Sequence, residues 1–295
     1  MLDPAQLAAL AAVHRRGAFD LAAAELGVTP SAISQRIKAL EDRAGALLIR
    51  RGQPCVATET GLRLIRHHDE ISVLAQGLAA DLPGLGSGPA RLRIAVNADS
   101  LATWVIPALS ATEGYLFDLV IDDQDVSQDL LRRGDVSGAI TSHPGPLQGC
   151  DTIRLGALRY RATASPAFIA HWFPDGVTAA ALAKAPTLSF SDADRLQDRW
   201  VGLHVGTDSP PVLPCHRLAS SHGFVEACRN GLAWSMNAEA LVAADLRTGT
   251  LVELVPDTPL DVPLYWQFTR LAAPALAPLT AAITKATKSA LVQPG

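Results

Sequence analysis

The 295-residue chain lacks most features that mark membrane and secreted proteins. No apolar run reaches the roughly 20 residues of a membrane span, and the first residues do not form a signal peptide. We therefore expect a cytoplasmic protein that contacts no membrane. It has only 4 cysteines, Cys55, Cys150, Cys215 and Cys228, which are far apart and lack metal-ligand spacing. They are expected to be reduced core residues, and no metal site is predicted.

Catalytic motifs are also missing. The chain has no Gly-x-Ser-x-Gly elbow, no His-Glu-x-x-His pair, no Walker sequence and no Gly-x-Gly-x-x-Gly that opens a helix. Its scattered serines, histidines and aspartates can be combined into a triad only on paper. We predict no catalytic residues, no cofactor and no enzymatic activity.

Negative charge is in slight excess, with a net charge of −4, which is unusual for a chain that binds nucleic acid. The first 68 residues differ from the whole, because they carry nine arginines and lysines against six aspartates and glutamates, an excess of 9 − 6 = 3. A modest local excess suffices for phosphate contacts if a dimer doubles it.

The stretch from Phe19 to Arg51 predicts two helices joined by a short turn. The first helix is expected from about Asp20 to Leu26, and Gly27 supplies a left-handed residue that ends it. The second is expected from Pro30 to Arg43, with Thr29 as its cap. This arrangement is a helix-turn-helix.

The second helix has an apolar face and a polar face. Ala32, Ile33, Ile37 and Leu40 recur at helical spacing, whereas short polar residues and cations lie opposite them. Such a face suits base reading in a major groove, although a small helical bundle would show the same solvated face. The predicted DNA-contacting residues of this helix are Thr29, Ser31, Ser34, Gln35, Arg36 and Lys38.

The flanking sequence strengthens the prediction. An amphipathic helix around Leu7 to Val13 precedes the pair, and residues 47–58 read as two short strands around Gly52 to Pro54, a wing that carries Arg50 and Arg51. This segment resembles the winged helix-turn-helix of LysR-type transcriptional regulators. The matching sequences are Ala22-Ala-Ala-Glu-Leu26, Thr29-Pro-Ser-Ala-Ile-Ser-Gln-Arg-Ile-Lys-Ala-Leu-Glu41 and Thr58-Glu-Thr-Gly61.

One long helix is expected from residue 59 to about residue 83. Apolar residues alternate at spacings of four and three, which is typical of a coiled-coil seam, but a helix buried on its own domain fits nearly as well. The expected seam comprises Leu64, His68, Ile71, Ala75, Leu78, Leu82 and Leu85. The resemblance favours the seam, because LysR-type proteins dimerise through this helix. A flexible hinge, Pro83 to Pro89, follows.

From Arg91 onward, strands and helices alternate, which predicts an α/β domain with a mostly parallel sheet. We expect two α/β halves that are joined by a double crossover and enclose a cleft, an architecture like that of periplasmic binding proteins. The predicted domains are a winged helix-turn-helix domain (1–58), a linker helix and hinge (59–88) and an effector-binding domain (89–295). Subdomain I of the last comprises residues 89–163 and 268–295, and subdomain II comprises residues 164–267.

Two polar segments should lie at the edge of this cleft. Asn97-Ala-Asp-Ser100 follows a strand and opens a helix, so its N–H groups suit an α-carboxylate. Asp122-Asp-Gln-Asp125 closes the next strand and suits a cation, although helix caps and solvated carboxylates explain the same residues.

A closer resemblance favours a ligand site. Asn97-Ala-Asp-Ser-Leu-Ala-Thr-Trp104, Leu130-Leu-Arg-Arg-Gly-Asp-Val136, Leu155-Gly-Ala-Leu-Arg159, Leu196-Gln-Asp198 and Pro263-Leu-Tyr-Trp-Gln267 are similar to the ArgP/LysG subgroup of LysR-type regulators. That subgroup senses basic amino acids and activates a lysine or arginine exporter gene. The effector-binding residues predicted on this basis are Asn97, Asp99, Ser100, Thr103, Asp122, Asp123, Thr141, Ser221 and His222.

The sequence also departs from the subgroup. His222 stands where an acidic residue is usual, and Asn237 lies in a second altered segment. The loss of a carboxylate that makes a charged hydrogen bond costs about 1.5 to 3 kcal/mol, so we expect an effector that differs from lysine or binds more weakly. There are two alternatives. The chain could be a LysR-type regulator that senses another small molecule, or a small-molecule-binding protein or enzyme that does not bind DNA. The predicted partners are an interrupted palindrome in double-stranded DNA, RNA polymerase and further copies of the chain in a homodimer or homotetramer.

Overall fold

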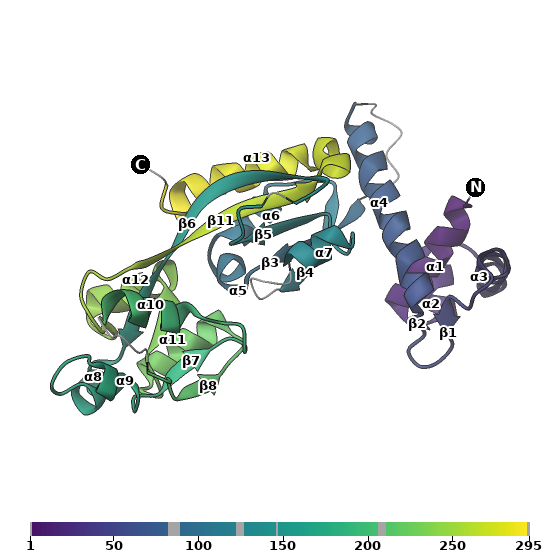
Figure 1. The fold of residues 1–295 in the computed structure, drawn as a ribbon. Coiled ribbons are helices and arrows are strands. Elements are labelled where there is room, and N and C mark those ends of the chain that lie inside the picture. The colour runs from purple at the N-terminus through teal and green to yellow at the C-terminus, as the bar shows by residue number, and fades with distance from the viewer. Residues whose placement is uncertain (1, 82–88, 122–126, 146, 206–210, 294–295) are drawn as a thin grey trace. The chain divides into compact units, whose positions relative to one another are not determined.

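The computed structural model describes residues 2–81, 89–121, 127–145, 147–205 and 211–293. Contacts between residues divide the chain into two compact units, shown in Figure 1. The first unit is Met1–Leu92 with Gly114–Leu116, and the second is Arg93–Glu113 with Phe117–Gly295. The predicted hinge lies almost entirely in residues 82–88, outside the described residues.

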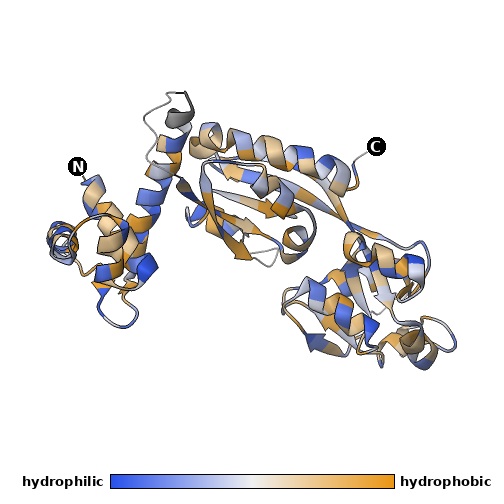
Figure 2. Cartoon of the chain, turned by 180° about the vertical axis from the view of Figure 1, so that it is seen from behind, coloured by the Kyte–Doolittle hydropathy of each residue, from blue (hydrophilic) through white to orange (hydrophobic). Residues whose placement is uncertain are grey.

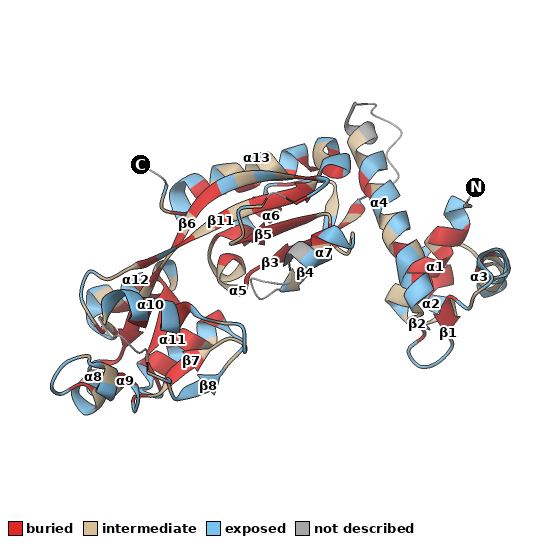
Figure 3. Ribbon diagram, in the orientation of Figure 1, coloured by how far each residue is buried: buried red, intermediate tan, exposed pale blue. Residues whose placement is uncertain are grey.

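The first unit is the predicted winged helix-turn-helix followed by a long helix. Its elements are α1 (Pro4–Arg16), α2 (Phe19–Glu25), α3 (Pro30–Ala44), β1 (Ile49–Arg50), β2 (Val56–Ala57) and α4 (Glu59–Asp81). The helices α2, α3 and α4 all contact α1, and the buried residues concentrate there (Figure 3). The amphipathic helix predicted around Leu7 to Val13 is therefore the centre of the core.

Local sequence explains where these helices begin and end. The Asp3 side chain accepts a hydrogen bond from the N–H of Ala5 at the start of α1, and Gly17 ends that helix with φ 71°. Gly27 adopts φ 63° in the turn before α3, as predicted. A left-handed residue is required at such a turn, and glycine adopts it without a steric penalty.

The long helix α4 is confirmed, but the predicted seam is only partly visible. Leu64 and His68 are half-buried and Ile71 is exposed, whereas the side chains of Leu78, Leu82 and Leu85 lie outside the described residues. Burial lowers the pKa of His68. An ion pair between Arg15 and Asp69 ties α1 to α4. Across the described part of the chain, no helix is long and apolar enough to cross a membrane.

The second unit contains a sheet with the strand order β10-β6-β11-β5-β3-β4, and β9 also pairs with β6. Subdomain I holds β3 (Ala90–Val96), α5 (Ala98–Ser100), a π-helical turn (Leu101–Val105), α6 (Ile106–Ser110), β4 (Tyr115–Ile121), α7 (Ser127–Arg132), β5 (Gly138–Thr141) and α13 (Ala273–Ala290). Subdomain II holds α8 (Pro166–Trp172), α9 (Ala179–Leu182), β7 (Thr187–Ser189), α10 (Leu196–His204), β8 (Cys215–Arg217), α11 (Ser221–Arg229), β9 (Ser235–Ala238), α12 (Glu239–Thr248) and β10 (Val252–Glu253).

Two long strands, β6 (Cys150–Ala164) and β11 (Leu260–Thr269), run through both subdomains. They pair with each other in antiparallel register, so they are the predicted double crossover (Figure 1). The boundaries expected after residues 163 and 267 fall within these strands, because each strand belongs to both halves.

The expectation of a mostly parallel sheet was wrong. β3 pairs with β5 in parallel, but β11 is antiparallel to β5 and β6, and β6 is antiparallel to β9 and β10. The two crossover strands, β6 and β11, cause the difference, because each runs antiparallel to its neighbours in the sheet. In Figure 2 the strands of this sheet carry much of the apolar sequence of the unit.

The paired crossover strands have one irregularity. Their register shifts between Leu264 and Tyr265, opposite Gly156, which has φ 126°. A Cβ at Gly156 would lie 2.8 Å from the carbonyl oxygen of Val292, so the close approach of the C-terminal segment requires glycine there. Beyond this point, Arg159 donates two hydrogen bonds of 2.8 Å to the carboxylate of Asp261 on the neighbouring strand.

Candidate functional site

The first candidate surface is the polar face of α3. The Thr29 hydroxyl accepts a hydrogen bond of 3.2 Å from the N–H of Ala32, which fixes the start of the helix. Ile33, Ile37 and Leu40 are buried against the core. The residues predicted to contact DNA lie on the other side: Ser31, Gln35 and Lys38 are exposed, and Ser34 and Arg36 are half-buried.

The end of α3 and the wing are joined through Glu41. Its carboxylate accepts hydrogen bonds from the N–H groups of Leu48 at 2.8 Å and Ile49 at 3.3 Å. Arg50 is exposed on β1, and the guanidinium of Arg51 lies 5.1 Å from the ring centroid of Phe19 on α2. Arg50 therefore lies on a strand that is fixed to α3, and Arg51 follows directly after that strand. This geometry suits contacts with the DNA backbone beside a groove.

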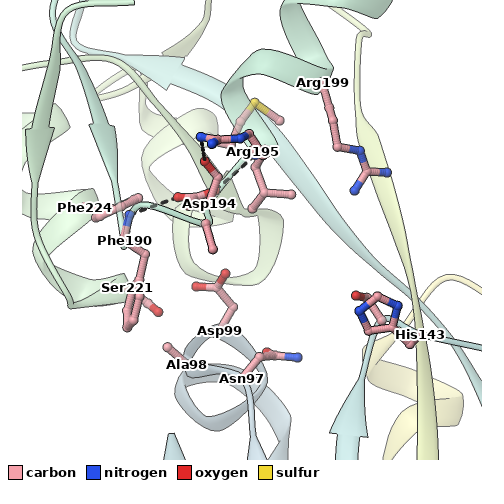
Figure 4. A pocket seen from close by; sticks show the side chains of 14 residues that line it. Asn97, Ala98, Asp99, His143, Phe190, Asp194, Arg195, Arg199, Ser221 and Phe224 are labelled. Carbon is pink, nitrogen blue, oxygen red and sulfur yellow. Dashed lines mark hydrogen bonds between the residues drawn. The ribbon is translucent and has the colours of Figure 1, made fainter. Parts of the chain in front are cut away.

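The second candidate site is a cavity of about 270 Å³ between the subdomains of the second unit. Subdomain I contributes the start of α5 and the loop after β5, and subdomain II contributes the loop after β7 and parts of α10, α11 and β9 (Figure 4). The lining residues are Asn97, Ala98, Asp99, Ser142, His143, Phe190, Ala193, Asp194, Arg195, Leu196, Arg199, Ser221, Phe224 and Met236.

Asp99 is the carboxylate that projects from α5 into the middle of this cavity (Figure 4). Its Oδ2 accepts a hydrogen bond of 2.8 Å from the hydroxyl of Tyr160 on β6. Burial raises the pKa of Asp99, the hydroxyls of Ser221 and Tyr160 act against this rise, and the charge of Asp194 adds to it. A cation bound beside Asp99 would remove this penalty, so the site is chemically suited to an ammonium or guanidinium group.

Asp194, across the cavity, has its oxygens engaged. Oδ2 accepts a hydrogen bond of 2.9 Å from the N–H of Phe190, and Oδ1 accepts one of 3.0 Å from the N–H of Leu196. These two bonds connect the Asp194 carboxylate to both ends of the loop before α10, and they stabilise the conformation of that loop. Asp99 is thus the more available of the two carboxylates.

The segment that starts with Asn97 was expected to bind an anion through its N–H groups, but one of these groups is bonded within the segment. The Asn97 side-chain oxygen accepts a hydrogen bond of 2.7 Å from the N–H of Ser100, so this donor is already engaged. The Thr103 hydroxyl donates to the carbonyl oxygen of Asp99 at 2.6 Å. Neither Ser100 nor Thr103 lines the cavity, and the Thr103 hydroxyl is bonded to the backbone.

The remaining predicted effector residues divide into three groups. Ser221 lines the cavity, and Thr141 lies beneath it, where its hydroxyl accepts a hydrogen bond of 3.2 Å from the N–H of His143. His222 is exposed and does not line the cavity. Asp122 and Asp123 lie outside the described residues.

Asn237, the second departure, is buried in subdomain II. Its Nδ2 donates to the hydroxyl of Thr163 at 2.9 Å and to the sulfur of Cys228 at 3.5 Å. Burial raises the pKa of the Cys228 thiol to about 12. This departure is a packing difference and lies outside the cavity lining.

The other cysteines are free, and all except Cys215 are buried. Cys215 is exposed, which corrects the prediction of four core thiols. A search of the described residues finds no cluster of three or more histidine, cysteine, aspartate or glutamate side chains that could hold a metal.

Apart from Ser221, the sequence did not predict the part of the cavity that subdomain II supplies. Phe190, Arg199 and Met236 come from a region in which neither α10 nor β9 was predicted. A signal for α10 exists, since Leu196, Gln197, Trp200 and Val201 are buried at helical spacing.

Comparison with known protein families accounts for both units. Residues 4–62 match the model of the bacterial regulatory helix-turn-helix protein, lysR family, and residues 86–288 match the LysR substrate binding domain. This chain belongs to the LysR family. It is a LysR-type transcriptional regulator, with the predicted DNA-binding fold followed by an α/β substrate-binding domain, and not an enzyme.

Relatives of this LysR-type chain are similar over its whole length. The HTH-type transcriptional regulator ArgP of Pseudomonas fluorescens (strain Pf0-1) is 42% identical over 297 residues, which cover 99% of each chain. LysG of Mycobacterium bovis is 44% identical over 280 residues, which cover 95% of this chain and 91% of LysG. The resemblance to the ArgP/LysG subgroup is therefore confirmed.

Two solved structures of such regulators are similar in fold. ArgP from Mycobacterium tuberculosis has a TM-score of 0.77 and 41% identity, with all of both chains covered. Full-length LysG from Corynebacterium glutamicum with bound effector Arg has a TM-score of 0.66 and 35% identity, and 99% of this chain and 100% of LysG are covered.

Proposed function

We propose that this LysR-type regulator works in the cytoplasm and responds to lysine or arginine bound in the cavity around Asp99. The observation that carries this proposal is the half-buried carboxylate at the centre of the cavity, which gains most from a cationic ligand. It is supported by the similarity to LysG, whose solved structure contains Arg as its effector. The proposed role is activation of an exporter gene for the same amino acid.

On DNA, two copies of the chain would place two α3 helices in successive major grooves of an interrupted palindrome. Ser31, Ser34, Gln35 and Arg36 would read bases, while Thr29, Lys38, Arg50 and Arg51 would hold the backbone. A homodimer or homotetramer whose packing depends on the effector would change the bend of the DNA and its contact with RNA polymerase.

The base-reading proposal predicts that Gln35→Ala and Arg36→Ala lose site preference. Each lost base contact should cost about 1 to 3 kcal/mol on the preferred site and little on unrelated DNA. Gel retardation of the upstream DNA of the gene, with a scrambled competitor, measures this ratio. Arg247→Ala in the second unit is the matched control for losing a cation. If Gln35→Ala and Arg36→Ala both keep the ratio of the wild type, the assignment of base-reading residues is wrong.

Effector binding can be measured separately by thermal unfolding of the full chain with lysine, arginine, histidine and leucine. A ligand at a hundred times its dissociation constant adds about 2.7 kcal/mol, and roughly 2 to 4 °C per kcal/mol is expected for a domain of this size. We expect a rise with lysine or arginine and none with leucine. A rise with leucine or histidine alone would favour a regulator of another small molecule.

A further inference from the structure

The cavity around Asp99 also contains positive charges, to which the proposed function assigns no role. Arg195 and Arg199 both line its wall in subdomain II, at the start and in the middle of α10. A site selective for a bare cation gains nothing from two arginines, because like charges raise the free energy of the bound cation. The ligand must therefore carry a negative group as well.

The two arginines differ in their partners. Arg195 donates to the carbonyl oxygen of Asp194 at 3.4 Å, and its guanidinium lies 3.9 Å from the carboxylate of Asp198. Arg199 forms no ion pair or side-chain hydrogen bond with any residue that the structure describes. Its donors are therefore available to a ligand.

The position of Arg199 fits this role. In Figure 4 its side chain extends from α10 toward the side of the cavity where His143 lies, while Asp99 points into the middle from below. Burial and the charge of Asp99 raise the pKa of Tyr160, the residue that donates to Asp99, whereas the charge of Arg199 lowers it. Arg199 is thus close enough to act, from the opposite subdomain, on the donor to Asp99.

We propose that Arg199 binds the carboxylate of the effector while Asp99 binds an amino or guanidino group of the same molecule. An arginine can hold a carboxylate through two parallel hydrogen bonds, which a helix start with an engaged N–H cannot offer. The pair would select amino acids with a free carboxylate over diamines that match only the positive charges. This assignment rests on the proposed function of the cavity. It adds that Arg199 is the residue that selects for the carboxylate of the effector.

The test is calorimetric titration of the full chain with lysine, with its decarboxylated analogue 1,5-diaminopentane and with lysine methyl ester, and with the matching arginine series. The wild type should bind the amino acid and bind the diamine and ester at least ten times more weakly. Arg199→Gln should weaken amino-acid binding about ten- to a hundredfold, and it should leave diamine binding unchanged or make it tighter because a like charge is removed. The discrimination between the two ligands should then largely disappear.

Arg195→Gln is the matched control, because it removes an arginine from the same wall and should keep most of the discrimination. Arg199 is exposed, so its replacement should leave the unfolding temperature of the ligand-free chain unchanged. The proposal is overturned if Arg199→Gln binds the amino acid like the wild type, or if Arg195→Gln loses as much. A wild type that binds neither lysine nor arginine would instead overturn the proposed function, and this assignment with it.

Discussion

Gly61→Ala is expected to destabilise the DNA-binding unit by about 1 to 3 kcal/mol, although alanine is normally the better helix residue. Gly61 lies in the first turn of α4, where the helix meets the wing. A Cβ there would lie 2.2 Å from the carbonyl oxygen of Leu48 and 3.2 Å from the Cβ of Ala57. That oxygen also accepts a hydrogen bond of 2.9 Å from the N–H of Thr58, so a shift that relieves the clash would weaken this bond.

The measurement is thermal unfolding of the full chain together with retardation of its DNA. Gly202→Ala is the matched control, since Gly202 is also helical but has no neighbouring atom within 4 Å of the added Cβ. The control should gain about 0.5 to 1 kcal/mol from the lower entropy of the unfolded chain. Gly61→Ala should lose stability and DNA affinity together. An equal gain for both variants would contradict the close packing of α4 on the wing.

Affinity for lysine is expected to fall up to tenfold for each pH unit below the pKa of ligand-free Asp99. Burial raises that pKa, whereas an ammonium group beside the carboxylate would lower it, so the complex binds fewer protons than the free chain. Binding must then release a proton. Affinity is therefore highest above the raised pKa and weakens as the pH falls through it.

Titration calorimetry over a pH series that begins near the ordinary aspartate pKa of about 3.9 and extends well above it measures this slope. Asp99→Asn should bind lysine about ten- to a hundredfold more weakly and with a flat pH profile. A slope that survives in this variant would come from a group other than Asp99. Tyr160→Phe removes a donor to the carboxylate and should move the fall in affinity to higher pH. If the wild-type affinity is constant across the range, Asp99 is not the group that receives the cation.

The winged helix-turn-helix could be predicted from sequence because its signals are local. Gly27, Thr29 and Pro30 specify one turn and one helix start, and the spacing of Ile33, Ile37 and Leu40 specifies the buried face. Each signal spans only a few residues. The structure therefore reproduced these elements to within one or two residues.

The effector cavity was harder to predict because its residues converge from distant parts of the chain. Asn97, Asp99 and Ser221 were predicted and line the cavity, but the role of Asp99 depends on Tyr160, 61 positions later on a strand that was not predicted. That strand, β6, alternates buried and exposed residues but carries Arg154, Arg159 and Arg161 among them. Ser100 and Thr103 do not line the cavity, and the Thr103 hydroxyl shows why such residues mislead, because near a helix start a hydroxyl bonds to the backbone as readily as to a ligand.

The pairing of β6 with β11 restricts how the two subdomains can move. Strands held in one hydrogen-bonded register do not slide or stretch, because a shift by one residue would turn every side chain to the opposite face. Opening and closing of the cavity must therefore occur by bending and twisting of this two-stranded ribbon. The weakest point of the ribbon is the register shift at Leu264 and Tyr265 opposite Gly156. Since Tyr160 lies four residues beyond Gly156 and donates to Asp99, a bend at this point would move the donor to the carboxylate in the cavity.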